Sequence, residues 1–129
     1  MSTVLSALRY SAEHEWVDDA SPARIGVSQV AADNLGDVVY LDLPEAGSTV
    51  TAGEVCGEIE STKSVSELFS PVTGTVAEVN AEAVENPAVV NEDPYGAGWL
   101  VRVEPNEIAD VENLMDAAAY EAYVSGGGE

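Results

Sequence analysis

Two short segments with the character of β-strands enclose the only lysine of this 129-residue chain. Residues 54–60 alternate in polarity, which predicts that Val55 and Ile59 face a core while glutamates face water. Residues 65–69 form the second strand-like segment. The residues between them are expected to form a tight turn, because paired strands on either side anchor such a connection. Lys63 would then stand at the tip of a β-hairpin, within reach of other proteins.

Strand-like segments recur along the rest of the chain with turn signals between them, as is typical of a mostly β fold. Further strands are expected at residues 13–18, 23–27, 37–43, 75–79 and 98–103. Ala20-Ser21-Pro22 is expected to connect the first two of these, and Trp99, Val101 and Val103 to share one face of the last. Residues 47–50 and 74–76 resemble each other on either side of the hairpin, which suits a β-sandwich with approximate two-fold symmetry.

Helices are expected in two places. Ser28 is placed to cap a short helix that ends at Gly36, where a residue without Cβ is favoured. A second helix is expected over about residues 106–124, with Asn106 as its N-cap and Met115 in its apolar stripe. Residues 85–94 are expected to form a loop with one helical turn. The chain as a whole (1–129) is expected to be one domain with a core over about residues 8–105 and a frayed tail at 125–129.

The net charge of −20 limits the partners that the chain can have. Twenty-four acidic residues against four basic ones would repel phosphate backbones and anionic lipids, so neither nucleic acid nor a membrane is expected as a partner. The acids are spread along the chain, which indicates a solvated surface. Such a surface suits a salt-rich, halophilic cytoplasm, and an acidic docking face is the alternative.

Cysteine content and the N-terminal sequence favour a cytoplasmic protein. Cys56 is the only cysteine, so no intrachain disulfide is expected, and it is interpreted as a small strand residue. The first nine residues have neither the basic start nor the apolar run of a secretion signal, and no later run approaches about 18 apolar residues.

Several motifs around the lysine resemble a known pattern. Gly53-Glu54-Val55, Glu60-Ser61-Thr62-Lys63 and Ser70-Pro71-Val72-Thr73-Gly74 are similar to the lipoyl and biotinyl carriers, in which a lysine lies between a Gly-bearing strand and a Pro-x-x-Gly turn. Four other segments narrow the resemblance to the H protein of the glycine cleavage system. They are Glu13-His14-Glu15-Trp16-Val17, Leu35-Gly36-Asp37-Val38-Val39-Tyr40, Leu43-Pro44-Glu45-Ala46-Gly47 and Asn91-Glu92-Asp93-Pro94-Tyr95-Gly96-Ala97-Gly98-Trp99-Leu100. The resemblance covers about residues 8–124.

This resemblance implies a lipoyl-domain-like fold, a barrel-sandwich hybrid with short helices and a C-terminal helix. It implies that Lys63 carries lipoic acid in amide linkage, attached by a lipoate-attaching enzyme. The arm would accept the aminomethyl group of glycine from glycine decarboxylase (P protein) and present it to an aminomethyltransferase (T protein). It would then pass reducing equivalents to dihydrolipoyl dehydrogenase (L protein). Such a chain is a carrier and catalyses none of these steps.

The resemblance also implies a cleft that shelters the loaded arm. Glu15 and Glu67 would help to hold its cationic amine, as carboxylates suit an ammonium group. At Asn34 some family members have histidine, so this chain lacks that imidazole.

Other classes of protein remain as alternatives. Biotin carriers usually set the lysine between methionines, whereas Lys63 lies between Thr62 and Ser64. A lipoyl domain of a 2-oxoacid dehydrogenase would lack the His-Glu-Trp-Val segment. An enzyme would need metal at the single His14, or a pocket that makes Lys63 a Schiff-base nucleophile, and neither is expected at these positions. An acidic module that only binds other proteins is the third class, and no metal or catalytic residue is predicted.

Overall fold

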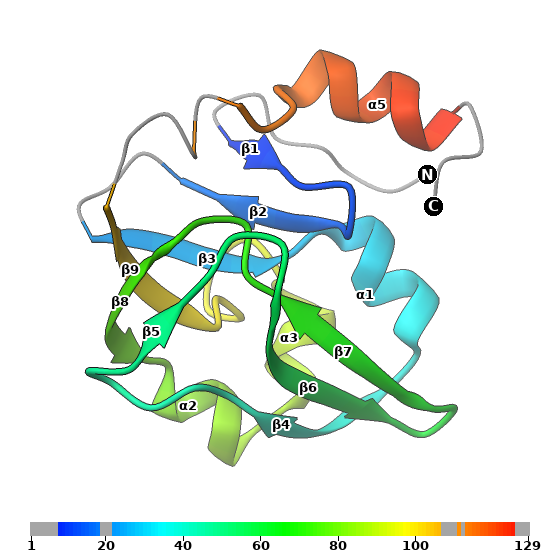
Figure 1. The fold of residues 1–129 in the computed structure, drawn as a ribbon. Helices are drawn as coiled ribbons and strands as arrows, with labels where there is room; N and C mark the ends of the chain where they lie inside the picture. Colours follow the sequence, from blue (N-terminus) through cyan, green and yellow to red (C-terminus); the bar gives the residue numbers. More distant parts are fainter. Residues whose placement is uncertain (1–7, 19–21, 107–110, 112, 126–129) are drawn as a thin grey trace.

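The computed structural model describes residues 8–18, 22–106, 111 and 113–125, and these form two antiparallel sheets with short helices (Figure 1). The larger sheet has the strand order β1-β2-β3-β9-β8-β5. Its strands are β1 (Arg9–Tyr10), β2 (Glu15–Val17), β3 (Ala23–Val27), β9 (Val101–Pro105), β8 (Gly74–Val79) and β5 (Thr49–Val50). The smaller sheet has the order β4-β6-β7, with β4 (Val38–Asp42), β6 (Val55–Ser61) and β7 (Val65–Phe69). The predicted mostly β fold with two sheets is confirmed.

The two segments that resemble each other in sequence lie beside each other in the fold. Strand β5, from the first segment, pairs antiparallel with β8, from the second, with Thr49 opposite Thr75 and Val50 opposite Gly74. The segment that contains the lysine hairpin therefore leaves the larger sheet at β5 and returns to it at β8.

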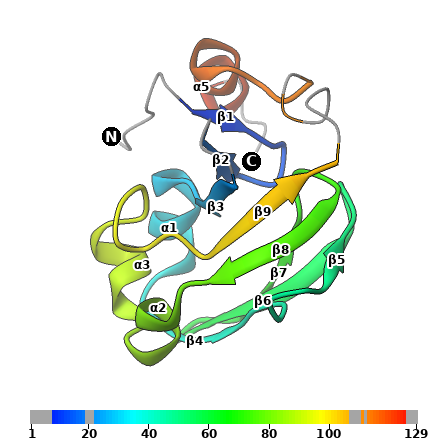
Figure 2. The same ribbon diagram turned by 90° about the vertical axis from the view of Figure 1, so that its left-hand side faces the viewer.

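The core consists of three clusters of buried side chains. One lies under the smaller sheet and includes Leu41, Ile59 and Leu68, while another lies in the larger sheet and includes Val76 and Val103. Leu43 and Cys56 pack against both of these clusters. The third is aromatic and is built around Tyr10, Trp16 and Tyr120. Figure 2 shows that the first three helices gather at one side of the two sheets.

The predicted capping of the first helix is confirmed. In α1 (Gln29–Leu35) the Ser28 side chain accepts the N–H of Ala31 at 3.2 Å, and Gly36 ends the helix with φ +77°. A positive φ strains any residue with a Cβ, which explains why glycine stands at this position.

Residues 81–92 contain more helix than the sequence predicted. Helix α2 (Ala81–Glu85) is followed after two residues by α3 (Ala88–Glu92). The single helical turn expected within residues 85–94 is present as α3, whereas α2 was not predicted. Its prolines lie where helices tolerate them, since Pro87 precedes α3 and Pro94 follows it.

The strand expected at residues 98–103 begins later than predicted. Strand β9 starts at Val101, and Val101 and Val103 share the cluster of the larger sheet. Trp99 packs instead against the aromatic cluster, and its carbonyl accepts a hydrogen bond from Asn80. The connection expected at Ala20-Ser21-Pro22 lies mostly outside the described residues, although β2 and β3 do pair antiparallel on either side of it.

The expected C-terminal helix over 106–124 is wrong at its centre. Asn106 follows β9 directly, and its N–H binds the carbonyl of Thr73. Residues 107–110 and 112 lie outside the described part of the chain. Met115 pairs with Tyr10 through two backbone hydrogen bonds of 2.8 and 2.9 Å, so it extends the edge of β1.

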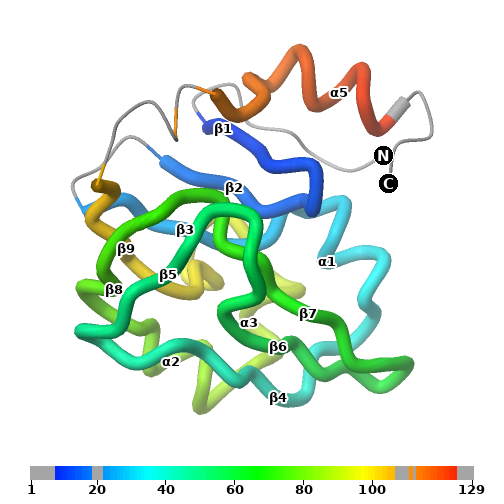
Figure 3. The backbone as a smooth tube through the Cα atoms, in the orientation of Figure 1, coloured from blue at the N-terminus to red at the C-terminus, as the bar shows by residue number. Residues whose placement is uncertain are grey.

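Helix α5 (Ala117–Ser125) starts only after this bridge, where Asp116 Oδ1 accepts the N–H of Ala119. A side-chain acceptor of this kind favours the start of a helix at this point. Figure 3 shows α5 lying across β1. Within the described residues, no helix is both long and apolar enough to cross a membrane.

Candidate functional site

Lys63 lies at the tip of the β6–β7 hairpin, as the sequence predicted. Glu60 pairs with Val65 and Ile59 with Ser66, which leaves Thr62 and Lys63 as the connection between Ser61 and Ser64. Figure 3 shows this tip extending beyond the rest of the smaller sheet. The Lys63 side chain is exposed, so its amine is accessible to a second protein.

Ser61 fixes the shape of the turn. Its hydroxyl accepts the N–H groups of Lys63 and Ser64, each at 3.2 Å, and donates to the carbonyl of Ser64 at 3.1 Å. The side chain is buried, so these bonds are protected from water. Ser61 thereby holds the lysine backbone in place.

The hairpin tip rests on the corner between α1 and β4. The N–H of Thr62 donates to the carbonyl of Asp37 at 3.0 Å. A Cβ on Gly36 would lie only 3.1 Å from Cε of Lys63. The aliphatic stem of the lysine therefore lies over a residue that has no side chain.

The outer face of the hairpin differs from the predicted alternation at its start. A β-bulge between Val55 and Gly57 shifts the register, so Val55 is 48% exposed and faces outward. Cys56 takes the inward position and packs against two core clusters. The prediction that Val55 faces the core is wrong, because one inserted residue reverses the faces of those before it. Ile59 is buried as predicted.

Three carboxylates form a row across the outer face of the smaller sheet. Asp42 of β4 is opposite Glu58 of β6, and Glu58 is opposite Glu67 of β7. Like charges directly opposite each other destabilise a sheet. In the next row Glu60 lies between Tyr40 and Val65, which are 56% and 57% exposed. Exposed apolar side chains thus lie next to the lysine tip.

Glu15 is a buried carboxyl group at the other end of the hairpin. It is 2% exposed, its Oε1 accepts from Ser11 Oγ at 2.6 Å, and its Oε2 accepts the N–H of Phe69 at 3.4 Å. Burial raises the pKa of Glu15 to about 8, against the opposing effect of the bonds from Ser11 and Phe69. The group is therefore mostly protonated at neutral pH.

The other residues predicted for the arm cleft are exposed. Asn34 lies in the last turn of α1, two residues before the Gly36 corner on which Lys63 rests. Glu67 lies on β7 between Lys63 and Phe69. Along this strand Phe69 is about 13 Å beyond Val65, at roughly 3.3 Å per residue. Asn34 is thus near the lysine end of the hairpin and Glu15 near the opposite end.

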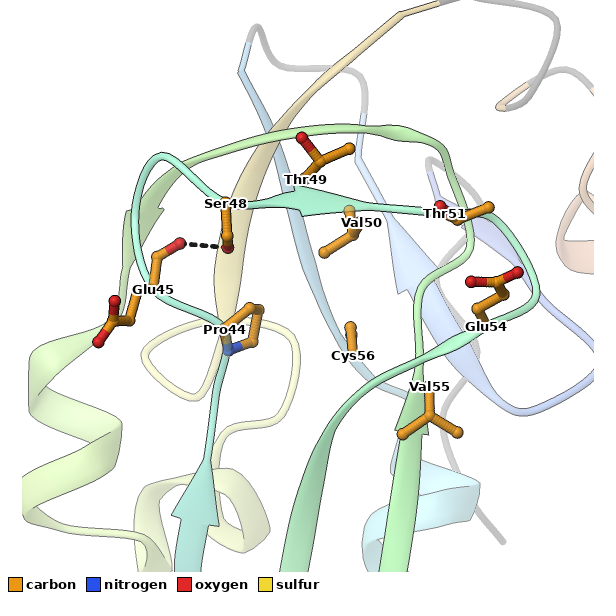
Figure 4. A pocket seen from close by; sticks show the side chains of 9 residues that line it. All are labelled: Pro44, Glu45, Ser48, Thr49, Val50, Thr51, Glu54, Val55 and Cys56. Carbon is orange, nitrogen blue, oxygen red and sulfur yellow. Dashed lines mark hydrogen bonds between the residues drawn. The ribbon is translucent and has the colours of Figure 1, made fainter.

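Two depressions in the described surface lie away from the lysine tip. One of about 350 Å³ is lined by residues from Pro44 to Cys56 at the start of β6 (Figure 4). The other, also about 350 Å³, lies beside Ser11, Glu13 and Ser70. Burial raises the pKa of Cys56 to about 11, with a further contribution from Glu15. Cys56 is therefore a structural thiol, as the sequence indicated.

A hydrogen-bonded aromatic group that the sequence did not reveal holds α5 to the sheet. The hydroxyl of Tyr120, fully buried, lies 2.6 Å from His14 Nδ1 and 2.7 Å from Ser28 Oγ. Its ring stacks on Tyr10 with centroids 4.4 Å apart. His14, considered as a metal ligand from the sequence, thus has a packing role. No group of three or more potential ligand side chains among the described residues could hold a metal.

Comparisons with known proteins agree on one family. The model of the family described as glycine cleavage H-protein matches residues 8–126. A glycine cleavage system H protein of Beutenbergia cavernae is 60% identical over 118 residues, which are 91% of this chain and 93% of the relative. One of Myxococcus xanthus is 55% identical, covering 89% of this chain and 90% of the relative. The crystal structure of a glycine cleavage system H protein from Mycobacterium marinum matches with a TM-score of 0.84 and 44% identity. The match covers 96% of this chain and 99% of that chain.

The two sheets and the exposed lysine hairpin define a carrier domain of the lipoyl type. The chain belongs to the glycine cleavage H-protein family. It is accordingly the lipoyl-bearing carrier of the glycine cleavage system and not one of its catalysts, and its partners are the P, T and L proteins.

Proposed function

We propose that Lys63 is the residue to which the lipoyl group is attached. The observation that carries this proposal is the position of the only lysine of the chain, exposed at the tip of a hairpin whose backbone is fixed by Ser61. A carrier needs a rigid mount for a flexible arm, since the mount sets the effective concentration that each active site experiences.

The surroundings of Lys63 fit such a group. The stem lies over Gly36, and the Lys63 side chain is exposed to solvent. The neighbouring Thr62 and Ser64 are small and exposed, which leaves space for an attaching enzyme. When bound, the group supplies a dithiolane that can accept the aminomethyl group and later deliver electrons. The chain itself provides the mount, and the exposed Tyr40 and Val65 provide apolar contacts beside it.

We also propose that Glu15, Glu67 and Asn34 serve the loaded arm. Glu67 is exposed on β7, between the lysine and the strand end where Glu15 lies. A cationic amine close to Glu15 would favour its ionised form and lower its raised pKa. The buried carboxyl would then form a charge-assisted bond that exists only when the amine is present. Asn34 offers an amide near the lysine end of the hairpin and cannot take up a proton as histidine does.

Two further expectations belong to the proposal. A single domain is supported by Leu43 and Cys56, which pack against both of the clusters that lie in the two sheets. A cytoplasmic location is supported by the unpaired Cys56, which needs no oxidising compartment.

The test of the proposal is a comparison of the parent chain with Lys63→Arg. Both are incubated with a lipoate-attaching enzyme, and their intact masses are measured by mass spectrometry. The parent should gain one lipoyl increment, and the variant none, because a guanidinium cannot be acylated in this way. A biotin increment on protein from native cells would favour a biotin carrier, and no increment under any growth condition would favour a binding module.

A second measurement separates attachment from folding. Lys63 is exposed, so the free energy of unfolding of Lys63→Arg should lie within about 0.5 kcal/mol of that of the unmodified parent. In a reconstituted assay with the P, T and L proteins, the folded variant should support no glycine-dependent formation of NADH. Turnover near the level of the parent would show that Lys63 is not the carrier residue.

A further inference from the structure

Asn91 connects the two sides of the corner on which the lysine tip rests. Its Nδ2 donates to the carbonyl of Gly36 at 2.7 Å and to that of Ala32 at 3.4 Å, and its Oδ1 accepts the N–H of Val38 at 2.9 Å. Asn91 is on α3, 53 positions after Val38 in the sequence. One side chain thus forms hydrogen bonds with backbone groups at the end of α1 and at the start of β4.

The same corner is the contact surface for the lysine hairpin. Asp37, between Gly36 and Val38, accepts the N–H of Thr62 through its carbonyl at 3.0 Å. The Lys63 stem lies over Gly36. Asn91 therefore binds the two residues that flank the acceptor of Thr62, and the Lys63 stem lies over one of them.

We propose that Asn91 is a positioning residue for Lys63, acting through the Gly36–Val38 corner. The proposal deepens the proposed function and rests on it. The last carbonyls of a helix have no partner within the helix, so a side chain that binds them restrains the corner that follows. An amide is suited to this corner because it both donates to a carbonyl and accepts an N–H. With the corner fixed, the platform under the lysine stem has one orientation, and the amine is presented in one direction.

The chain contains a matched control for this residue. Asn80 is a buried asparagine whose Nδ2, like that of Asn91, donates to two backbone carbonyls, those of Ala97 at 2.8 Å and Trp99 at 2.6 Å. Both of these side-chain hydrogen bonds are with the segment before β9, away from the Gly36–Val38 corner. Asn80→Ala therefore removes a comparable set of hydrogen bonds at a site away from the lysine.

The experiment compares Asn91→Ala and Asn80→Ala in the full chain without lipoyl. Hydrogen exchange by NMR gives the protection of the Thr62 N–H relative to buried amides of the larger sheet. Lipoylation kinetics give kcat and KM for a purified lipoate-attaching enzyme. Asn91→Ala should lower the protection of Thr62 selectively. It should lower kcat for lipoylation about tenfold with little change in KM, because a small misplacement of a reacting group is costly while the recognised surface is unchanged.

The outcomes are distinguishable. Equal Thr62 protection and equal kcat in the two variants would overturn the proposal, and a selective loss in Asn91→Ala would support it. If Asn91→Ala does not fold, Asn91→Asp replaces it, since the carboxylate keeps the acceptor for Val38 but loses the donors to Gly36 and Ala32. A parent that gains no lipoyl on Lys63 would refute the proposed function, and the Thr62 protection would still decide whether Asn91 positions the tip.

Discussion

Glu15 is hydrogen bonded to the backbone N–H of Phe69, at the end of the strand that begins beside Lys63. The buried carboxyl of β2 thereby joins the larger sheet to the far end of the lysine hairpin. Because burial raises the pKa of this carboxyl to about 8, the bond is made mainly by a protonated group at neutral pH.

The raised pKa predicts how stability depends on pH. In the unfolded chain Glu15 titrates near 4.5, and in the folded chain at about 8. The folded state therefore binds more protons between these values, and the contribution of Glu15 to stability is full below about pH 4.5 and is lost as the pH rises through 8. Glu15→Gln removes this titration. From pH 5 to pH 8.5 the free energy of unfolding of the variant should rise relative to the parent by a few kcal/mol, because each pH unit between the two pKa values corresponds to about 1.4 kcal/mol.

Chemical denaturation of both proteins across this pH range checks the prediction. The general repulsion among acidic residues also changes with pH, but it is nearly the same in the two proteins and cancels in the difference. A constant difference in stability from pH 5 to pH 8.5 would contradict the assignment of a raised pKa to Glu15.

The row of Asp42, Glu58 and Glu67 predicts a dependence on salt. Glu58 has a like charge on each side, so Glu58→Gln should stabilise the fold by about 0.5–1 kcal/mol at low ionic strength. In 1 M salt the Debye length falls to about 3 Å, and most of this gain should disappear. The parent itself, with a net charge of −20, should melt at a higher temperature in molar salt than in dilute buffer.

Glu121 provides the control for this substitution. It is exposed on α5 and has no cross-strand partner, so Glu121→Gln should change stability much less than Glu58→Gln in dilute buffer. Thermal melts at several salt concentrations measure both. A parent whose melting temperature is flat or falls with salt would refute the idea that surface repulsion limits its stability.

The aromatic group under α5 predicts a cost for removing one oxygen. Tyr120→Phe keeps the ring that stacks on Tyr10 but removes the hydroxyl that lies near His14 Nδ1 and Ser28 Oγ. Loss of a buried hydrogen-bonding group should lower the free energy of unfolding by about 1–3 kcal/mol. Tyr123→Phe, which removes a 3.3 Å exposed bond to the carbonyl of Ala12, should cost clearly less. Urea denaturation of the two variants compares them, and equal losses would argue against a special role for Tyr120.

Local patterns in the sequence were sufficient to predict the lysine hairpin and helix α1. The Ser28 cap, the Gly36 stop and the strand alternation around Ile59 each depend on neighbours within a few residues. The outward position of Val55 was not predictable in this way, because it depends on a bulge set by pairing with β7. The break before α5 likewise depends on the pairing of Met115 with Tyr10, more than 100 positions earlier.

The protonation state of Glu15 also could not be predicted from the sequence. Glu15, Trp16 and Val17 are all buried, so β2 is covered on both faces and shows no alternation that would mark one face as exposed. The hydrogen-bond partner of Glu15, Phe69, is more than 50 positions away in the sequence. Local sequence patterns therefore could not reveal this contact. The contact of Glu15 with Ser11 is local in the sequence, since a serine four residues before Glu15 can close the intervening turn.

The contact between Gly36 and Lys63 predicts two separable effects of a single methyl group. Gly36→Ala should destabilise the fold by about 1–3 kcal/mol, because φ +77° with ψ −160° is a conformation that is strained for any residue with a Cβ. The methyl would also meet the Lys63 stem at 3.1 Å and displace it. Gly53→Ala isolates the first effect, since Gly53 has φ +82° but nothing within 4 Å of its Cβ position. The two variants should therefore lose similar stability in chemical denaturation, while only Gly36→Ala should shift the NMR signals of the Lys63 side chain and slow its lipoylation. If Gly53→Ala slows lipoylation equally, backbone strain alone would explain the loss, and the stem contact would have no part in presenting the amine.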